Sequence, residues 1–235
     1  MLLFLFILFF LLLLYTLIPF GLSRWGGIGV FQRAGNDERL AFTFDDGPDP
    51  VYTNELLDLL QKYQVKASFF VVGSRAEQYP EVIQRMYREG HLIGIHNYVH
   101  RSNWLMTPWR VKQGVMKTAD TLEKITGERP VYYRPPWGML NFFDFFIHKD
   151  FRLILWSVMA GDWRSKGGKD KILHRLRKKI KPGSVILLHD CGVTYGADED
   201  APKYTIQALK QLIKELLEKG YSFTRIDEMV KKEKR

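Results

Sequence analysis

The fold is decided at residues 40–50, which read LAFTFDDGPDP. The first half of this stretch is a short, mostly apolar run, which is the pattern of a buried β-strand. The second half combines Asp, Gly and Pro at a density that is typical of a turn. The stretch therefore predicts a strand whose carboxyl end is followed at once by two carboxylates, Asp45 and Asp46.

Outward from this strand, strand and helix patterns alternate along the chain. We predict further strands at 67–72, 92–95, 131–133, 153–158, 185–188 and 221–224. Between them we predict a helix that Thr53 caps and further helices at 80–89, at Thr107 to about Gly127, at 169–180 and at 202–217. This alternation predicts an α/β protein with a parallel sheet that curls into a (β/α) barrel. Because about 190 residues are few for eight β/α units, we expect a distorted or incomplete barrel.

The two ends of the chain differ from this pattern. Residues 1–22 carry no charged side chain and are mostly Leu and Phe, which predicts a transmembrane helix that anchors the protein. A cleaved signal peptide is the alternative, but such peptides usually have a basic start and a small-residue cleavage site. We therefore expect an anchor at 1–22, a linker at 23–38, one domain at 39–228 and a basic tail at 229–235.

The net charge of +9 favours anionic surroundings such as nucleic acid, an anionic membrane surface or acidic wall polymers. No recognisable nucleic-acid module accompanies the charge, so we expect no nucleic-acid partner. The single cysteine, Cys191, excludes an internal disulfide and a cysteine-rich zinc site. The sequence leaves the oligomeric state open.

Candidate reactive side chains follow the predicted strands at the points where the strands end. In a barrel the carboxyl ends of the strands converge on one face, where active sites are built. Residues far apart in the sequence are therefore expected to form one site, and these residues are Asp45, Asp46, His96, His100, Arg134, Asp162 and His189.

His96 and His100 lie four residues apart, so on one helical turn both imidazoles point the same way and can bind one metal ion. One carboxylate of the Asp45–Asp46 pair completes a His₂Asp set, and three ligands with an open position are typical of a catalytic zinc-type site. Two adjacent carboxylates also repel each other unless a metal neutralises one and a cation such as Arg134 the other. The alternatives are structural histidines and an Asp turn that binds backbone amides.

Three further features have both structural and functional interpretations. A single histidine at a strand end, such as His189, is more often structural, but the converging geometry favours catalysis. The loop RPPWG at 134–138 is either a stiff proline turn or part of the site. Trp163 either lines a groove, because aromatic faces stack on sugar rings, or is a half-buried core residue.

Together these residues resemble the NodB-homology polysaccharide deacetylases, carbohydrate esterase family 4, over residues 39–228. The resemblance lies in five motifs in the family's order: TFDDGP at 43–48, HNYVH at 96–100, RPPWG at 134–138, DW at 162–163 and LLH at 187–189. It implies a NodB-like barrel and an enzyme that removes N-acetyl groups from a polysaccharide, with peptidoglycan or a related N-acetylglucosamine glycan as the expected partner.

The resemblance also implies roles for individual residues. Asp45 would be the general base, Arg134 would orient it, and His189 would be the general acid. Asp46, His96 and His100 would hold a divalent metal, with zinc expected and cobalt or nickel as alternatives. The backbone N–H of Trp137 would assist in binding the oxyanion. The substrate would be bound by Pro136, Trp137, Trp163 and Leu187.

Two departures from the family pattern stand out. Asn97 replaces the usual Ser or Thr, and Asn can still bond backbone groups there. Met159 stands where the fourth motif has its first Asp, so we expect His189 to lack the carboxylate that raises its pKa, unless another carboxylate serves. Two alternative functions therefore stay open: an amidase for another N-acyl substrate, and a catalytically weak or silent glycan-binding homologue.

The expected location is the bacterial cell membrane, with a single span and the catalytic domain outside. Arg24 follows the apolar run and no basic side chain precedes it, so the positive-inside rule taken literally would place the domain in the cytoplasm. We place it outside because the expected substrate is there.

Overall fold

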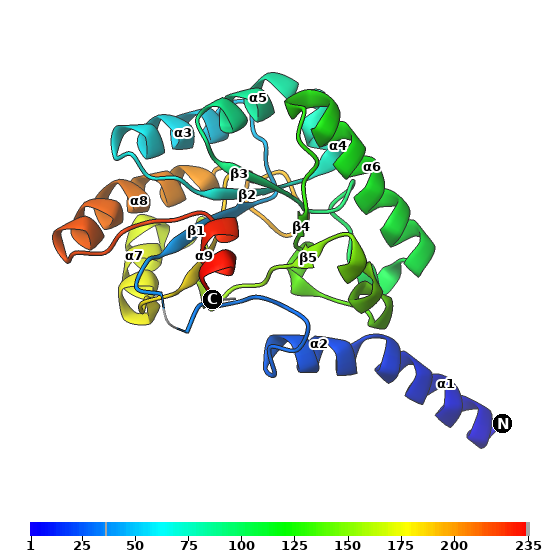
Figure 1. Ribbon diagram of the computed structural model, residues 1–235. Helices are drawn as coiled ribbons and strands as arrows, with labels where there is room; N and C mark the ends of the chain where they lie inside the picture. The colour runs from blue at the N-terminus through cyan, green and yellow to red at the C-terminus, as the bar shows by residue number, and fades with distance from the viewer. Residues whose placement is uncertain (36, 234–235) are drawn as a thin grey trace.

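The computed structural model describes residues 1–35 and 37–233, and its centre is a curled parallel sheet (Figure 1). In the described chain the sheet has seven strands in the order β5-β4-β3-β2-β1-β7-β6, and every pair is parallel. The strands are β1 Ala41–Asp45, β2 Ser68–Val71, β3 Leu92–Ile95, β4 Tyr132–Tyr133, β5 Arg152–Leu153, β6 Val158–Met159 and β7 Val185–His189.

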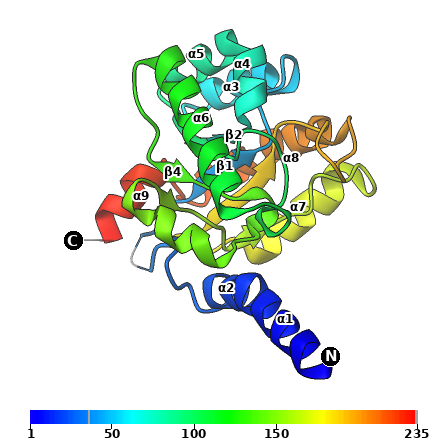
Figure 2. The ribbon, with the colours of Figure 1, turned by 90° about the vertical axis from the view of Figure 1, so that its right-hand side faces the viewer.

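Helices surround the sheet in an arc in both ribbon views (Figures 1 and 2). The long helix α6 shows why the chain folds locally as it does. Its cap residue Thr107 accepts a hydrogen bond from the backbone N–H of Arg110, and Gly127 ends it in the left-handed conformation. The helices of the arc are α3 Tyr52–Lys62, α4 Gly73–Gln78, α5 Pro80–Arg88, α6 Pro108–Thr126, α7 Gly168–Lys179 and α8 Ala201–Glu218, whereas α9 Ile226–Glu233 lies in front of the sheet in Figure 1.

The register of the central strands positions the functional site. All five residues of β1 are buried, as expected for a strand that is covered on both faces. On one side of β1, Asp45 pairs with His189 of β7, and on the other side it pairs with Phe70 of β2. The end of β1 therefore lies directly beside the end of β7.

The prediction of one strand at 153–158 is wrong. The segment contributes to two short strands, which lie at opposite edges of the sheet. β5 lies at one edge and β6 at the other, and residues 154–157 connect them. At this crossover the backbone N–H of Leu155 donates to the carbonyl of Phe31. A connection this short requires the two edges to curl toward each other, and the predicted incomplete barrel is confirmed.

Three local predictions differ from the structure. The segment at 221–224 contributes only an isolated bridge between Phe223 and Leu40 rather than a strand. Thr53 does not cap α3, since the helix begins at Tyr52 and the Thr53 hydroxyl donates to Asp190 instead. The short helix α4 was not predicted, because its sequence GSRAEQ has little apolar periodicity.

The packed part of the chain extends beyond the predicted domain limits of 39 and 228. Phe31 and Ala34 of the predicted linker are buried in the core, while residue 36 lies outside the described part. At the other end, α9 crosses the predicted boundary, and Met229 and Val230 are also core residues. Residues 234 and 235 of the predicted basic tail lie outside the described part.

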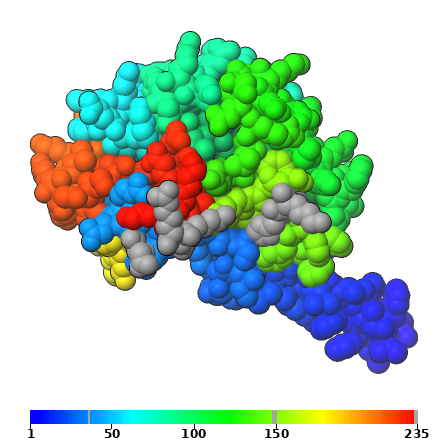
Figure 3. Space-filling view, in the orientation of Figure 1, coloured from blue at the N-terminus to red at the C-terminus, as the bar shows by residue number. Residues whose placement is uncertain are grey.

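The predicted anchor forms two consecutive helices, α1 Leu2–Tyr15 and α2 Leu17–Arg24. Taken together, the helical segment Leu2–Arg24 has 23 residues and is, by length and composition, apolar enough to cross a membrane. In the space-filling view α1 projects away from the body of the molecule (Figure 3).

Candidate functional site

The ends of β1 and β3 bring together one carboxylate and two imidazoles. The Oδ1 atom of Asp46 lies 3.3 Å from Nε2 of His96 and 3.2 Å from Nε2 of His100. Asp46 reaches this position because its backbone has a φ of +78°, which turns the chain sharply after β1. The potential ligand atoms of the three residues all lie within 4.8 Å of one another.

The protonation of these groups suits a cation. Nδ1 of His96 lies 2.6 Å from the carbonyl oxygen of Arg134, which can only accept, so Nδ1 carries the proton and Nε2 of the neutral ring has a lone pair. That lone pair faces Asp46 Oδ1, a buried oxygen with no hydrogen-bond partner among the described residues. Two electron-pair donors this close repel each other unless a positive ion binds both. The residues present therefore fit a divalent metal.

Neighbouring groups keep the Asp46 carboxylate ionised and oriented and the His100 imidazole neutral, as cation binding requires. Burial alone would raise the pKa of Asp46, but the positive charge of the nearby His189 helps to hold it well below its usual range. Burial lowers the pKa of His100 to about 4, so its imidazole stays neutral, as a metal ligand must be. The Thr194 hydroxyl donates to the other Asp46 oxygen over 2.6 Å and so orients the carboxylate.

Asp45 is bound by a fully buried arginine. Nη1 of Arg134 lies 2.6 Å from Oδ1 of Asp45, and the arginine side chain is 0% exposed. The same guanidinium donates to the Thr43 hydroxyl and to the carbonyls of Ile154 and Leu155. These bonds fix the arginine in one orientation, and the second Asp45 oxygen lies 3.9 Å from His96 Nε2, on the side of the candidate metal set.

His189, at the end of β7, also has a carboxylate partner. Its Nδ1 lies 3.0 Å from Oδ1 of Asp162, and its backbone N–H donates to Oδ2 of the same residue over 2.8 Å. The hydroxyl of Thr205 donates to Asp162 as well. Burial by itself would lower the pKa of His189, but the charge and hydrogen bond of Asp162 outweigh it and raise the pKa to about 9.

Comparisons with known proteins agree with this geometry. A family model described as polysaccharide deacetylase matches residues 32–142. The peptidoglycan-N-acetylmuramic acid deacetylase PdaC of Bacillus subtilis is 36% identical over 85% of this chain, which spans only 40% of that relative's length. A peptidoglycan-N-acetylglucosamine deacetylase of Bacillus cereus is 32% identical, with coverage of 87% of this chain and 94% of the relative.

This chain belongs to the polysaccharide deacetylase family. The solved structure of the Bc1960 peptidoglycan N-acetylglucosamine deacetylase, in complex with a hydroxybenzamide compound, superposes with a TM-score of 0.79 at 32% identity, covering 88% of this chain and 95% of that one. The predicted family, the class of enzyme and the NodB-like fold are thus confirmed. Polysaccharide deacetylases of this family are metal-dependent, and the described residues contain a candidate Asp-His-His set.

The expectation that Met159 deprives this polysaccharide deacetylase of a partner for His189 is wrong, and the alternative that another carboxylate serves is confirmed. Met159 lies in the short edge strand β6, and Asp162 follows three residues later. Gly161, with a φ of +70°, turns the chain between them. Asp162 therefore supplies the carboxylate that we had expected to be missing. Its position in the DW motif was visible in the sequence, but its contact with His189 was not.

Asn97 holds the loop between the two histidines. Its backbone is left-handed, with a φ of +61°, and Asn tolerates this conformation better than most residues. Its side-chain amide donates to the Arg101 carbonyl and to Asn103, and its side-chain oxygen accepts from the Tyr133 hydroxyl. The expected bond to a backbone group is confirmed. Asn103 in turn donates to Asp144, so a buried polar network that we had not predicted supports the loop.

Two tryptophans border the site on different sides. The Trp137 ring, 40% exposed, packs edge-on against His100 with ring centres 4.4 Å apart. The Trp163 ring packs against His189 at 5.5 Å. Pro136 and Leu187, the other two residues predicted to bind the substrate, are both buried.

Proposed function

We propose that this polysaccharide deacetylase removes acetyl groups from N-acetylated amino sugars of peptidoglycan, using a divalent ion, zinc in the first place, held by Asp46, His96 and His100. One observation carries the proposal. The Asp45–Arg134 pair and the Asp162–His189 pair meet at the strand ends beside the Asp-His-His set, and a carboxylate together with a protonated imidazole is what amide hydrolysis requires.

A divalent ion in this set supplies Lewis-acid chemistry, lowering the pKa of water and polarising the acetamide carbonyl. Asp45 then acts as general base and accepts the proton of the attacking water. Arg134 donates a hydrogen bond to the Asp45 carboxylate and fixes its orientation. The backbone N–H of Trp137 helps to stabilise the oxyanion.

His189 completes the reaction as general acid by donating a proton to the departing amine. Its ion pair with Asp162 favours the charged imidazole, so the proton is present at neutral pH. The products are acetate and a free amino sugar. A general acid typically contributes about 10²–10⁴ in rate.

Among the alternatives, the silent glycan-binding homologue loses its main support. It rested on Met159 leaving His189 without a carboxylate, whereas Asp162 binds that histidine at two points. An amidase for another N-acyl substrate would use the same groups. The two relatives compared above are deacetylases of peptidoglycan by name, which favours the polysaccharide.

We further propose that helix Leu2–Arg24 anchors the enzyme as a single span in the bacterial cell membrane, with the catalytic domain outside. This location supplies the proposed substrate and agrees with a net charge of +9 near anionic membrane and wall polymers. A cleaved signal peptide remains the alternative for the same helix.

The test is acetate release by the full-length protein in detergent, on peptidoglycan and on chitin oligomers, before and after treatment with a chelator. We expect turnover on peptidoglycan that the chelator abolishes and zinc restores. Asp45→Asn and His96→Ala proteins serve as matched controls. If both release acetate as fast as the parent, the assignment of the site is wrong. Turnover of small N-acyl amides alone would favour the amidase.

A further inference from the structure

The domain exposes a cluster of large apolar side chains beside the N-terminal helix. We call it the aromatic face and define it as Leu105, Trp109, Phe142, Phe143 and Phe146. Leu105 is 81% exposed, Trp109 73% and Phe146 62%. The Phe142, Phe143 and Phe146 rings contact one another, and Trp109 lines one cavity with Phe143 and Phe146. Single exposed apolar residues are normal on soluble proteins, but a group of this kind marks an interaction surface.

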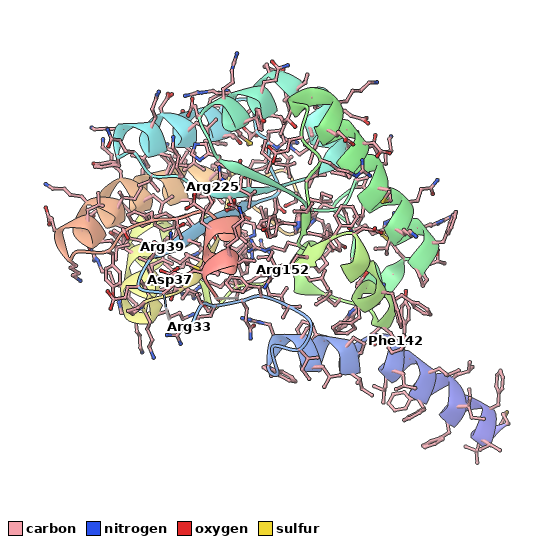
Figure 4. The ribbon with its side chains drawn as sticks, in the orientation of Figure 1. Arg33, Asp37, Arg39, Phe142, Arg152 and Arg225 are labelled. Atoms are coloured by element: carbon pink, nitrogen blue, oxygen red, sulfur yellow. The ribbon has the colours of Figure 1, made fainter. Side chains whose placement is uncertain are left out.

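This face is continuous with the apolar helix. The Tyr15 ring of α1 contacts Phe143 with ring centres 6.3 Å apart, and the Tyr15 hydroxyl donates to the Met106 carbonyl over 2.6 Å. Further along, Phe20 of α2 packs edge-on against Trp104 at 5.7 Å. In Figure 4, Phe142 is labelled directly beside the two helices.

The lengths of the two helices determine where a membrane would lie. α1 has 14 residues and is about 21 Å long, whereas the hydrocarbon core of a bilayer is about 30 Å thick. The candidate span of 23 residues reaches that thickness only when α2 is included. α2, however, is packed on the domain, because Ser23 is fully buried and Arg24 donates to the Trp156 carbonyl over 2.7 Å.

A bilayer that accommodates the span must therefore extend to the part of the domain that touches α2. The outward side of α2 supports this, since Leu17, Ile18 and Leu22 are all exposed. The aromatic face lies beside the same helices, because Tyr15 contacts Phe143 and Phe20 contacts Trp104, which directly precedes Leu105.

We infer that the aromatic face is a membrane-docking surface, inserted into the interface of the same bilayer that holds the helix. The inference rests on the proposed membrane anchor. The chemistry fits a lipid interface, where aromatic side chains are enriched. Exposed basic residues, Arg101, Arg110 and Lys112, lie nearby in the chain and suit anionic headgroups.

Docking by this face also places the active site. Leu105 follows His100 by only five residues, so the loop that carries the metal-site histidines continues directly into the docking surface. The catalytic domain is then held beside the lipid surface in one orientation rather than tethered by a flexible linker. Its substrates are the glycan strands closest to the membrane.

The test uses the full-length chain in proteoliposomes that contain phosphatidylglycerol. Nitroxide labels are attached at Trp109→Cys, Phe146→Cys and, as a matched control, Leu217→Cys, which replaces an exposed apolar residue of α8 on the far side of the domain (Figure 1). The native Cys191 is buried and is left in place. Collision of each label with oxygen and with a water-soluble nickel complex is measured by spin resonance.

We expect the labels at 109 and 146 to show a several-fold higher oxygen-to-nickel ratio than the label at 217. Three results would overturn the inference. One is a water-like ratio at all three sites in protein that resists carbonate extraction. Another is spin–spin broadening at 109 and 146, which would assign the face to a second copy of the chain. Extraction of the protein by carbonate would refute both the anchor and the docking surface, whereas acetate release by the same sample tests the deacetylase proposal separately.

Discussion

Asp162 holds His189 at two points, through Nδ1 of the ring at 3.0 Å and through the backbone N–H at 2.8 Å. The double contact sets both the orientation of the imidazole and its charge. It also explains why a chain with Met159 in its fourth motif retains a partnered histidine.

The Asp162→Asn substitution tests this relationship through the pH profile. Asn keeps a hydrogen-bonding side chain but removes the charge that raises the pKa of His189 to about 9. Because the general acid must be protonated, activity of the parent falls on the alkaline side, and in the variant this fall shifts to lower pH. We also expect the rate to drop by about 10²–10⁴. Acetate release measured from pH 6 to pH 10 provides the readout.

Met159→Leu is the matched control for that experiment. Among the described residues the Met159 side chain makes no hydrogen bond, and its backbone carbonyl accepts from Lys179, so this variant should keep the parent profile. An alkaline limb that moves in Met159→Leu and stays in place in Asp162→Asn would contradict the assignment.

Arg134→Met should destabilise the protein as well as inactivate it. The substitution leaves the Asp45 carboxylate buried without its cation, and breaking a buried pair in this way typically costs about 3–5 kcal/mol. Urea unfolding of the full-length chain in detergent measures the loss.

The double variant Arg134→Met with Asp45→Asn separates stability from catalysis. With both charges removed, much of the lost stability should return, while activity stays absent because no base remains. If the double variant is no more stable than Arg134→Met alone, the destabilisation has another source than the unpaired carboxylate.

Thr194→Val should weaken metal binding without removing a ligand. The Thr194 hydroxyl orients the Asp46 carboxylate, and loss of such a supporting hydrogen bond typically costs 10–100-fold in metal affinity. Competition with a fluorescent zinc chelator measures the affinity directly. Thr194→Ser, which keeps the hydroxyl, should bind like the parent, and equal affinity of Val and Ser variants would exclude this role.

Asp144→Asn should change how the stability of the protein depends on pH. Compared with the parent, the variant should gain stability as the pH rises from acidic to neutral. Burial raises the pKa of Asp144 to about 7, from an ordinary value of 3.8. The folded state therefore binds a proton that the unfolded state has lost between these values, so the parent loses stability as pH rises from 4 to 7. Asn does not titrate and escapes this loss. The free energy of unfolding of parent and variant is measured at pH 5 and at pH 7.5. The difference between the two proteins should be larger in favour of the variant at pH 7.5, and the same difference at both pH values would argue against the raised pKa.

Sequence reasoning located the residues of the site but not the contacts between them. Asp45, His96 and His189 lie together because parallel strands bring their carboxyl ends to one edge, a relationship that follows from strand order. The partnership of Asp162 with His189 depends on the turn at Gly161, and the support of Asn97 by Asn103 and Tyr133 depends on long-range packing. Neither leaves a periodic signal.

The same distinction applies to the fold. An apolar run such as residues 153–158 predicts buried extended chain, but whether it forms one strand or two is decided by the curvature of the whole sheet. The burial of Phe31 and Met229 was likewise invisible, because a few apolar residues beyond a regular pattern do not show what they pack against.

The crossover at residues 154–157 has a further consequence for protein engineering. The carbonyls of Ile154 and Leu155 that accept from Arg134 belong to the segment that brings the two sheet edges together. Transplanting loops between homologues at this point would change the tilt of the arginine and with it the aim of the Asp45 carboxylate. Grafts intended to alter glycan preference are better made at the rims carrying Trp137 and Trp163, which leave this connection intact.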